Sequence, residues 1–297
     1  MSTLPSTPPM PSPARGAMRV VIQGVRGAFH EIAARQFFNG PVEVVPAATF
    51  AELIRLAGQA AQTDAAVMAI ENSIAGSILG NYKLLQTSDL AITGEIFLPI
   101  RQNLLALPGV QAGDIREVHS HPMALAQCAD FFRQYPHWQL VETDDTAAAA
   151  ARIARDRRND MAAVGSALAA ELYGLTVLAS GIETHEANFT RFLVLERRET
   201  VASTAPNGSM SRRKISVCFS VPHRSGSLSR ILTVLAGQSA NLTKIQSVPI
   251  VGRVGEYLFF VDFTLENPAV IPETLRLLDV MTQACQVLGI YKPGELA

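Results

Sequence analysis

Short apolar runs alternate along the first two thirds of the chain with segments whose apolar residues recur at helical spacing. Residues 18–23 and 65–70 are apolar runs of strand length, whereas Phe29, Ile32 and Phe37 fall on one face of a helix. A continuous apolar run of this length is typical of a strand that is buried on both faces. The same patterns predict helices over 50–62, capped by Thr49, and over 122–133, with His121 at its start, and a strand over 175–179. The alternation continues to about residue 195 and predicts an α/β domain built on a parallel sheet.

The pattern changes after this domain, and a second module follows. Residues 196–212 begin with charges and continue with Thr, Ala, Pro, Asn, Gly and Ser, which is typical of a linker. Residues 213–293 then show the order strand, helix, strand, strand, helix, strand. This βαββαβ order predicts a ferredoxin-like sandwich. We therefore expect an α/β domain at 18–195 and a smaller domain at 213–293.

Composition narrows the possible partners. The 297 residues carry a net charge of −1 without a basic run, which argues against nucleic acid as a partner. No window approaches the roughly 18 apolar residues of a membrane span. Residues 1–17 are rich in Pro, Ser and Ala, lack the apolar core of a signal peptide and are expected to be disordered. Three widely spaced cysteines predict no metal site, and the expected location is cytoplasmic.

Polar side chains gather where predicted strands meet loops. Asn188, Thr190 and Arg191 precede or enter the apolar run 192–195, a predicted parallel strand, and the polar turn 71–77 follows an earlier strand. Open α/β sheets bind ligands at strand ends, and Arg presents a planar fork that matches a carboxylate. These residues predict an anion site. The alternative is a loop that satisfies its own backbone, with Arg191 in a surface ion pair.

Four segments together resemble the prephenate dehydratase family with a C-terminal ACT domain, and the resemblance covers residues 19–292. They are residues 70–77 (IENSIAGS), 120–128 (SHPMALAQC), 188–192 (NFTRF) and 241–245 (NLTKI). The resemblance implies a two-lobed, periplasmic-binding-protein-like dehydratase domain with its active site in the cleft. One lobe would hold residues 18–100 and 176–195, and the other 101–175.

The resemblance also implies an activity, which is the conversion of prephenate to phenylpyruvate, water and carbon dioxide in phenylalanine biosynthesis, with no cofactor. Thr190 would act as proton donor to the leaving hydroxyl or donate a hydrogen bond to it, and the weak acidity of a Thr hydroxyl favours the hydrogen bond. Asp144 would orient the substrate or supply a proton if burial raises its pKa, with helix capping as the alternative. Arg191 would pair with a substrate carboxylate or brace the loop against Glu71 or Glu183. The other implied catalytic or substrate-binding residues are Asn72, Ser120, Gln127, Ser73 and Phe192.

The resemblance implies phenylalanine as an effector at the ACT domain. The implied binding residues are Gly226, Ser227, Leu228, Asn241, Leu242, Ser247 and Pro249. Two departures from the family pattern stand out. Residues 24–31 (GVRGAFHE) lack the Thr and Ser hydroxyls usual in the first loop, and Gln246 and Val248 replace a charged pair in the ACT strand.

The resemblance further implies a homo-oligomer, either a dimer or a tetramer, because ACT sandwiches usually pair through their open edges. Two other functions remain open at this point. One is an arogenate dehydratase, which would release phenylalanine directly. The other is a non-catalytic amino-acid sensor that uses the two-lobed fold and the ACT domain only to bind.

Overall fold

The computed structural model describes residues 17–60, 62–203 and 212–295. The tail that was expected to be disordered lies outside these ranges except for Ala17, and so does the segment 204–211 of the predicted linker. Within the described ranges, no helix is long and apolar enough to cross a membrane.

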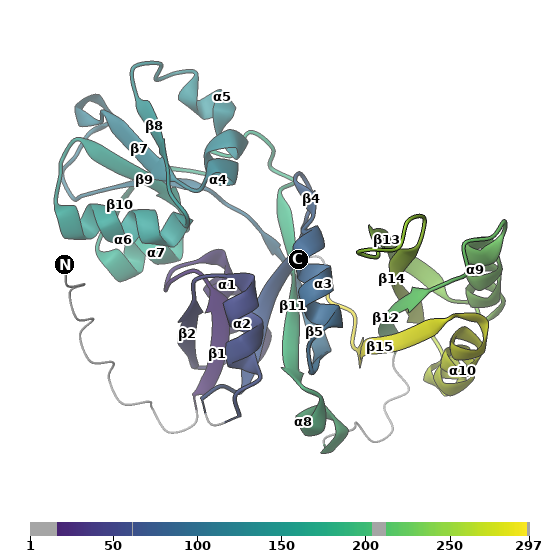
Figure 1. Ribbon diagram of the computed structural model, residues 1–297. Coiled ribbons are helices and arrows are strands. Elements are labelled where there is room, and N and C mark those ends of the chain that lie inside the picture. The colour runs from purple at the N-terminus through teal and green to yellow at the C-terminus, as the bar shows by residue number, and fades with distance from the viewer. Residues whose placement is uncertain (1–16, 61, 204–211, 296–297) are drawn as a thin grey trace.

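The first lobe is a mixed sheet with helices on its faces (Figure 1). Its elements are β1 (Met18–Gln23), α1 (Phe29–Phe38), β2 (Val42–Ala47), α2 (Phe50–Ala57), β3 (Ala65–Asn72), β4 (Gly76–Ser77), α3 (Leu79–Gln86), β5 (Leu90–Pro99) and β11 (Phe189–Arg197). β1 is parallel to β2 and β3, but β11 is antiparallel to both β3 and β5. The prediction of a parallel strand at 192–195 is therefore wrong, because β11 enters the sheet beside the carboxyl end of β3.

The second lobe has a five-stranded sheet of its own. Its elements are β6 (Asn103–Ala106), η1 (Ala112–Asp114), β7 (Glu117–Ser120), α4 (Pro122–Gln127), α5 (Ala129–Phe132), β8 (Gln139–Glu142), α6 (Thr146–Asp156), β9 (Met161–Gly165), α7 (Ala167–Tyr173) and β10 (Thr176–Ser180). The sheet order is β10-β6-β9-β7-β8, and β10 pairs antiparallel with β6. The predicted boundary, which gave residues 176–195 to the first lobe, is therefore wrong, and the chain crosses back only after Ser180.

Several helices are shorter than their apolar patterns suggested. Thr49 caps α2 by accepting a hydrogen bond from the Glu52 backbone N–H, as expected, but the helix ends at Ala57 rather than at residue 62. The helix predicted at 122–133 is broken at Cys128, whose φ of −107° ends α4 before α5 begins. Gly58, Ala60 and Gln62, which follow α2, are exposed, so no contact with the core extends this helix to residue 62.

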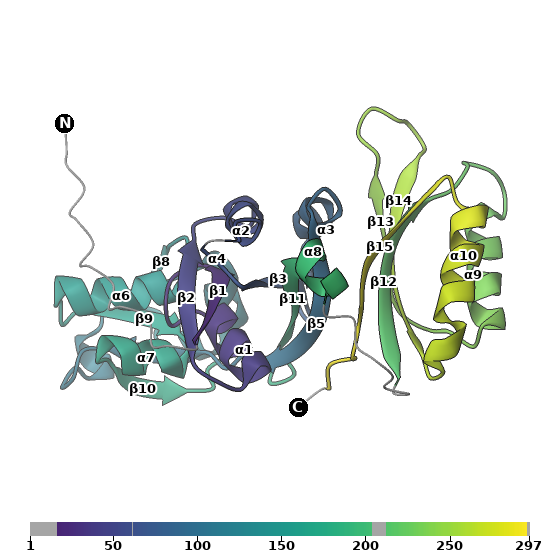
Figure 2. The ribbon, with the colours of Figure 1, turned by 90° about the horizontal axis from the view of Figure 1, so that it is seen from below.

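The C-terminal domain is the predicted βαββαβ sandwich. Its elements are β12 (Arg213–Ser220), α9 (Ser227–Gly237), β13 (Asn241–Pro249), β14 (Tyr257–Leu265), η2 (Pro268–Val270), α10 (Ile271–Met281) and β15 (Ala284–Tyr291). The strand order is β13-β14-β12-β15, and every neighbouring pair is antiparallel. Figure 2 shows α9 and α10 on the face of this sheet that points away from the first lobe.

The sheets of the first lobe and the C-terminal domain are joined. β15 pairs in parallel with β5 where Gly289 lies opposite Ile92 (Figure 2). Only glycine fits there, because a Cβ on Gly289 would overlap the carbonyl oxygen of Ile92. The predicted linker is also shorter at its start, since β11 continues to Arg197 and helix α8 (Arg198–Ser203) follows.

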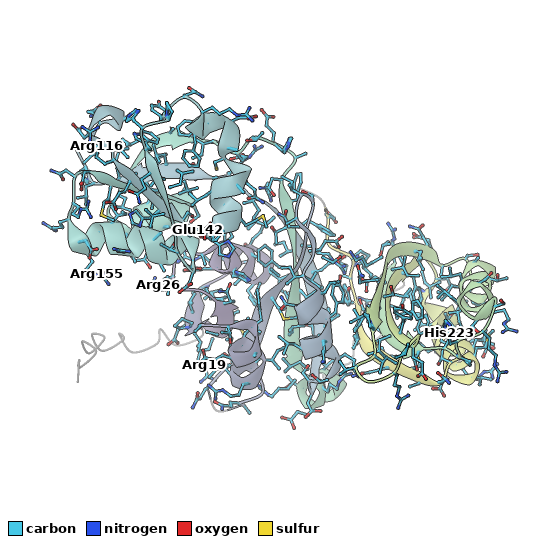
Figure 3. The ribbon with its side chains drawn as sticks, turned by 45° about the horizontal axis from the view of Figure 1, so that its top comes forward. Arg19, Arg26, Arg116, Glu142, Arg155 and His223 are labelled. Atoms are coloured by element: carbon cyan, nitrogen blue, oxygen red, sulfur yellow. The ribbon has the colours of Figure 1, made fainter. Side chains whose placement is uncertain are left out.

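The two faces of the first-lobe sheet are buried by different partners. One face packs on α1 and, through that helix, on α6 and α7 of the second lobe. The other face is covered by α2, α3 and residues of the C-terminal sheet such as Cys218, Phe260 and Leu288. Figure 3 marks Arg26 on the side of the first lobe that faces the second lobe, and His223 far away in the C-terminal domain. A side chain on β3 or β11 therefore points either to the face that carries α1 and the second lobe or to the face that carries α2, α3 and the C-terminal domain.

Candidate active site

A cavity of about 420 Å³ lies between the two lobes, where β3 ends and β11 begins. Side chains from both lobes line it. Five of the predicted site residues are among them, namely Asn72, Gln127, Asp144, Thr190 and Phe192. The other lining residues include Gln23, Phe29, His30, Phe50, Ile78, Gln102, His121, Met123 and Asp145. The cleft thus brings together residues that are distant in the sequence, such as Asn72 and Thr190, which are 118 positions apart.

Asn72 and Thr190 form a fixed pair at the base of this cavity. They lie opposite each other in the antiparallel ladder, and Asn72 Nδ2 donates a hydrogen bond to Thr190 Oγ1 at 3.0 Å. Asn72 Oδ1 accepts from the backbone N–H groups of Ile74 at 3.0 Å and Ala75 at 2.8 Å. Because two backbone donors require an oxygen at this position, the amide nitrogen must face Thr190.

The Thr190 hydroxyl can still donate a hydrogen bond. Its oxygen accepts the hydrogen bond from Asn72, and its proton has no acceptor among the residues that the structure describes. The residue is 8% exposed, so water does not surround the hydroxyl on all sides. A hydroxyl that already accepts a bond and is held in place is suited to donate to an oxygen on which negative charge develops.

Two predicted site residues, Ser73 and Ser120, do not line the cavity, and their hydroxyls bond to backbone groups. Ser73 donates to the carbonyl of Ala187 and accepts from the N–H of Phe189, both at 2.9 Å, so it braces the loop before β11. Ser120 is fully buried and donates to the carbonyl of Val164 at 2.7 Å. The predicted roles of Ser73 and Ser120 as direct ligands are therefore corrected to structural ones.

Arg191 also lies outside the cavity, on the opposite face of β11. Side chains alternate along a strand, so Thr190 and Phe192 face the cavity while Arg191 faces the C-terminal domain. Its guanidinium forms ion pairs of 2.7 Å with Glu95 and with Asp262. The expectation that Arg191 would bind a substrate carboxylate or brace the loop is therefore wrong, because β14 supplies a carboxylate that the sequence did not place there.

The second lobe contributes the side-chain amides of Gln102 and Gln127 to the cavity lining. Gln102 Nε2 lies 3.5 Å from Gln127 Oε1, which is a long hydrogen bond. Gln102 is 2% exposed, and its Oε1 has no partner within the described part of the chain. His121 accepts from the N–H of Met123 through Nδ1 and so caps α4, as the sequence suggested. Gln102 was not predicted, because nothing in its local sequence separates it from an ordinary strand residue.

The two neighbouring aspartates have different roles. Asp145 Oδ1 accepts from the N–H of Ala148 at 2.7 Å and caps α6, so the capping role that was considered for Asp144 belongs to Asp145. Burial raises the pKa of Asp145, against the opposing effect of its backbone hydrogen bonds. Asp144 lines the cavity without a side-chain cap bond to α6 and remains a candidate for orienting the substrate.

His30 on α1 is a cavity residue that the sequence analysis missed. Its ring meets Phe192 edge-on at 4.9 Å and Phe50 at 5.8 Å between ring centroids. Burial among these rings lowers the pKa of His30 to about 3, so the imidazole is neutral at physiological pH. The sequence contained a sign of this role. His30 lies in the segment 24–31, which was noted only because it lacks the Thr and Ser hydroxyls usual in the family.

The charges around the cavity are unusual for a site that binds an anion. Among the described residues that line it, none is Lys or Arg, and two are Asp. The N-terminus of α1 opens on the cavity at Ala28, which has no side-chain cap. Free backbone N–H groups at a helix N-terminus attract negative charge. Among the described lining residues, the backbone at the start of α1 is therefore the group suited to attract an anion, although the buried Glu31 carboxylate in the same turn accepts the Gly27 N–H at 2.7 Å.

The predicted effector residues fall into two groups in the C-terminal domain. Gly226 caps α9 in a left-handed conformation with φ of 76°, Ser227 is buried beside a cavity of about 270 Å³, and Leu228 is half-buried. The remaining four, Asn241, Leu242, Ser247 and Pro249, are exposed along β13. β13 pairs only with β14 in the described part of the chain, so its outer edge is open.

The sequence profile of the prephenate dehydratase family matches residues 20–200. The chain is 40% identical to arogenate dehydratase/prephenate dehydratase 2, chloroplastic, of Arabidopsis thaliana, over 92% of this chain and 72% of that protein.

Two solved structures are similar over most of both chains. The prephenate dehydratase of Arthrobacter aurescens in complex with L-Phe has a TM-score of 0.78 and 28% identity, covering 94% of this chain and 93% of that one. GqqA, described as a novel type of quorum quenching acylase, has a TM-score of 0.80 and 32% identity, covering 93% and 98%. With the family profile and the curated relative, these findings show that the chain belongs to the prephenate dehydratase family, a family of carbon–oxygen lyases.

Proposed function

We propose that the chain converts prephenate to phenylpyruvate, water and carbon dioxide in phenylalanine biosynthesis, at the cavity around Thr190. The observation that carries the proposal is the bond from Asn72 Nδ2 to Thr190 Oγ1, which leaves the hydroxyl proton free to point at a ligand. In the reaction, the bond from the ring carbon to its carboxylate breaks and its electron pair enters the ring. The opposite carbon–oxygen bond then breaks and its electron pair leaves with the oxygen. The departing oxygen accepts a hydrogen bond from Thr190 and takes up one proton from water in the cleft, so it leaves as water.

The residues at the cavity suit this chemistry without a strong acid. The ring becomes aromatic as the two groups depart, so the main requirements are correct positioning and a donor to the leaving oxygen. Thr190 meets the second requirement. Gln127 and Asp144 meet the first, together with the backbone N–H groups at the start of α1. Phe192 offers an apolar face to the ring.

Arogenate is the second candidate substrate, and one feature of the cavity favours it. Arogenate carries an ammonium group where prephenate carries a keto group, and Asp144 and Asp145 are two carboxylates in the lining. The Arabidopsis relative carries both activities in its name. Side-by-side kinetics decide between them. A kcat/KM that is higher for prephenate supports the proposal, and one that is at least about tenfold higher for arogenate, or 1.4 kcal/mol in transition-state binding, overturns it.

Two non-dehydratase functions are less well supported by this cavity. An acylase with a serine or cysteine nucleophile would need that residue in the cavity, and the described lining contains neither. A sensor would have no turnover at all, so incubation with prephenate or arogenate separates it from an enzyme. Formation of no product from either substrate by folded protein would contradict the dehydratase proposal.

Regulation by phenylalanine and assembly into a homo-oligomer are part of the same proposal. The open edge of β13 exposes Leu242 and Ile245, so a second copy that covers this edge would complete a wall around the predicted effector residues. We expect a cytoplasmic dimer or tetramer that binds phenylalanine at Gly226–Leu228 and along β13. Calorimetric titration with phenylalanine tests the effector site, and an absence of heat at millimolar ligand would remove it.

A further inference from the structure

Asn72 and Thr190, which we call the catalytic pair, lie on β3 and β11. The residue beside each of them in the chain forms an ion pair with the C-terminal domain. Thr190 and Asn72 face the cavity, whereas their neighbours Arg191 and Glu71, which also lie opposite each other in the ladder, do not line it. Asp262 pairs with Arg191 at 2.7 Å, and Lys244 pairs with Glu71 at 2.7 Å. Each half of the catalytic pair is therefore one residue away from an ion pair with the second domain.

The contact at Arg191 is a closed and neutral cluster. Its four charged side chains are at most 10% exposed, and they are two cations, Arg191 and Lys214, and two anions, Glu95 and Asp262. Tyr291 adds a hydroxyl that accepts from Arg191 at 3.2 Å. Removing one member of such a cluster leaves a buried charge without a partner. The cluster therefore holds the backbone of β11 at one position beside Thr190.

The contact at Glu71 repeats this arrangement on the neighbouring strand. Lys244 Nζ donates to Glu71 at 2.7 Å and to the Ser77 hydroxyl at 2.6 Å, so it spans β3 and β4 on both sides of the turn that Asn72 begins. Lys244 and Asp262 lie opposite each other in the ladder of β13 and β14. Lys244 and Asp262, which are neighbours across the C-terminal sheet, thus contact β3 and β11, the strands that carry Asn72 and Thr190.

We propose that Asp262 and Lys244 are positioning residues of the dehydratase site, which act through Arg191 and Glu71 to set the distance between Thr190 and Asn72. The inference rests on the dehydratase function proposed above and extends it. The C-terminal domain then forms part of the catalytic machinery even when no effector is bound. A movement of Lys244 and Asp262 would therefore shift Thr190 and Asn72 through Arg191 and Glu71.

The test compares Lys244→Met and Asp262→Asn with the control Glu273→Gln, which breaks an exposed ion pair with Arg276 on α10 of the same domain. We expect kcat of the first two to fall about tenfold with KM nearly unchanged, because a small misplacement of a catalytic group lowers turnover more than binding. The control should keep both constants. If Lys244→Met and Asp262→Asn keep the kcat of the wild type, the positioning role is refuted.

A charge exchange separates positioning from general stability. The double variant Glu71→Lys with Lys244→Glu restores the ion pair with its signs reversed, and we expect it to recover most of the kcat lost in Lys244→Met. Loss of activity without this recovery, at an unchanged melting temperature, would contradict the role assigned to the pair.

A second measurement does not depend on activity. Amide hydrogen exchange over residues 70–74 and 188–192 should increase in Lys244→Met and Asp262→Asn but not in Glu273→Gln. If the wild type converts neither substrate, the proposed function fails while this measurement still decides the inference. Unchanged exchange in both segments would overturn it.

Discussion

At the scale of single residues, the amide of Asn72 determines which way the Thr190 hydroxyl points. Its oxygen is held by the backbone N–H groups of Ile74 and Ala75, so its nitrogen is turned toward β11, where it donates to Asn188 Oδ1 at 2.8 Å and to Thr190 Oγ1 at 3.0 Å. The residue types could be predicted from the sequence, because both belong to recognisable segments. The direction of the bond could not, because it depends on the turn that follows β3.

Asn72→Asp tests this orientation. The carboxylate keeps an oxygen for the two backbone donors but places a second oxygen against Thr190, whose proton would then turn away from the cavity. We expect kcat to fall about 100-fold, the usual loss when one preorganised donor is removed. Steady-state kinetics with circular dichroism as a control for folding provide the measurement. A kcat within a factor of about three of the wild type would contradict the role of the amide as a donor.

His30 makes a prediction about stability and pH. Its pKa is about 3 in the folded protein and near 6.5 when unfolded, because burial disfavours the charged ring. Below pH 6.5 the unfolded chain binds a proton that the folded chain does not, so folding stability falls as pH falls. Between pH 7.5 and 5.5 the wild type should lose about 1.4 kcal/mol relative to His30→Phe.

Urea unfolding of both proteins at the two pH values gives this difference. Every other titrating group is shared by the two proteins, so its contribution cancels in the comparison. A difference that does not change with pH would mean that the imidazole is solvated and titrates normally in the fold.

At the scale of elements, the apolar pattern predicted most strands but not their directions. β11 and β10 are fully compatible with the patterns at 192–195 and 175–179, yet β11 is antiparallel and β10 belongs to the second lobe. Strand direction follows from where the chain enters the sheet, and a local pattern contains no information on that.

The junction of β15 and β5 is an element contact that a single residue permits. Gly289→Ala would place a Cβ against the backbone of Ile92, so the two strands must separate. We expect a loss of about 1–3 kcal/mol in unfolding free energy, the usual cost of overpacking. Gly237→Ala at the end of α9 is the control, because a Cβ there meets nothing within 4 Å. Equal stability of the two variants would show that the sheets are not in close contact.

At the scale of the whole molecule, the sequence indicated two domains and a cleft but not how the domains meet. The two lobes were predicted from the family resemblance, and the ferredoxin-like sandwich was predicted from the order of strands and helices. Arg191 shows the limit most clearly, since its partners Glu95 and Asp262 are distant in the sequence and only docking brings them together. The prediction that Ser73 and Ser120 bind the substrate was wrong for a different reason. Both hydroxyls donate to backbone carbonyl groups that are close to them only in the folded chain.

The most direct test of the site is the formation of phenylpyruvate from prephenate by the wild type and by Thr190→Val, which keeps the shape of the side chain and removes its hydroxyl. We predict turnover by the wild type. For Thr190→Val we predict a kcat at least about 100-fold lower, with KM within about threefold, because the lost bond is made mainly in the transition state. A folded Thr190→Val protein that turns over prephenate as fast as the wild type would contradict the role assigned to Thr190.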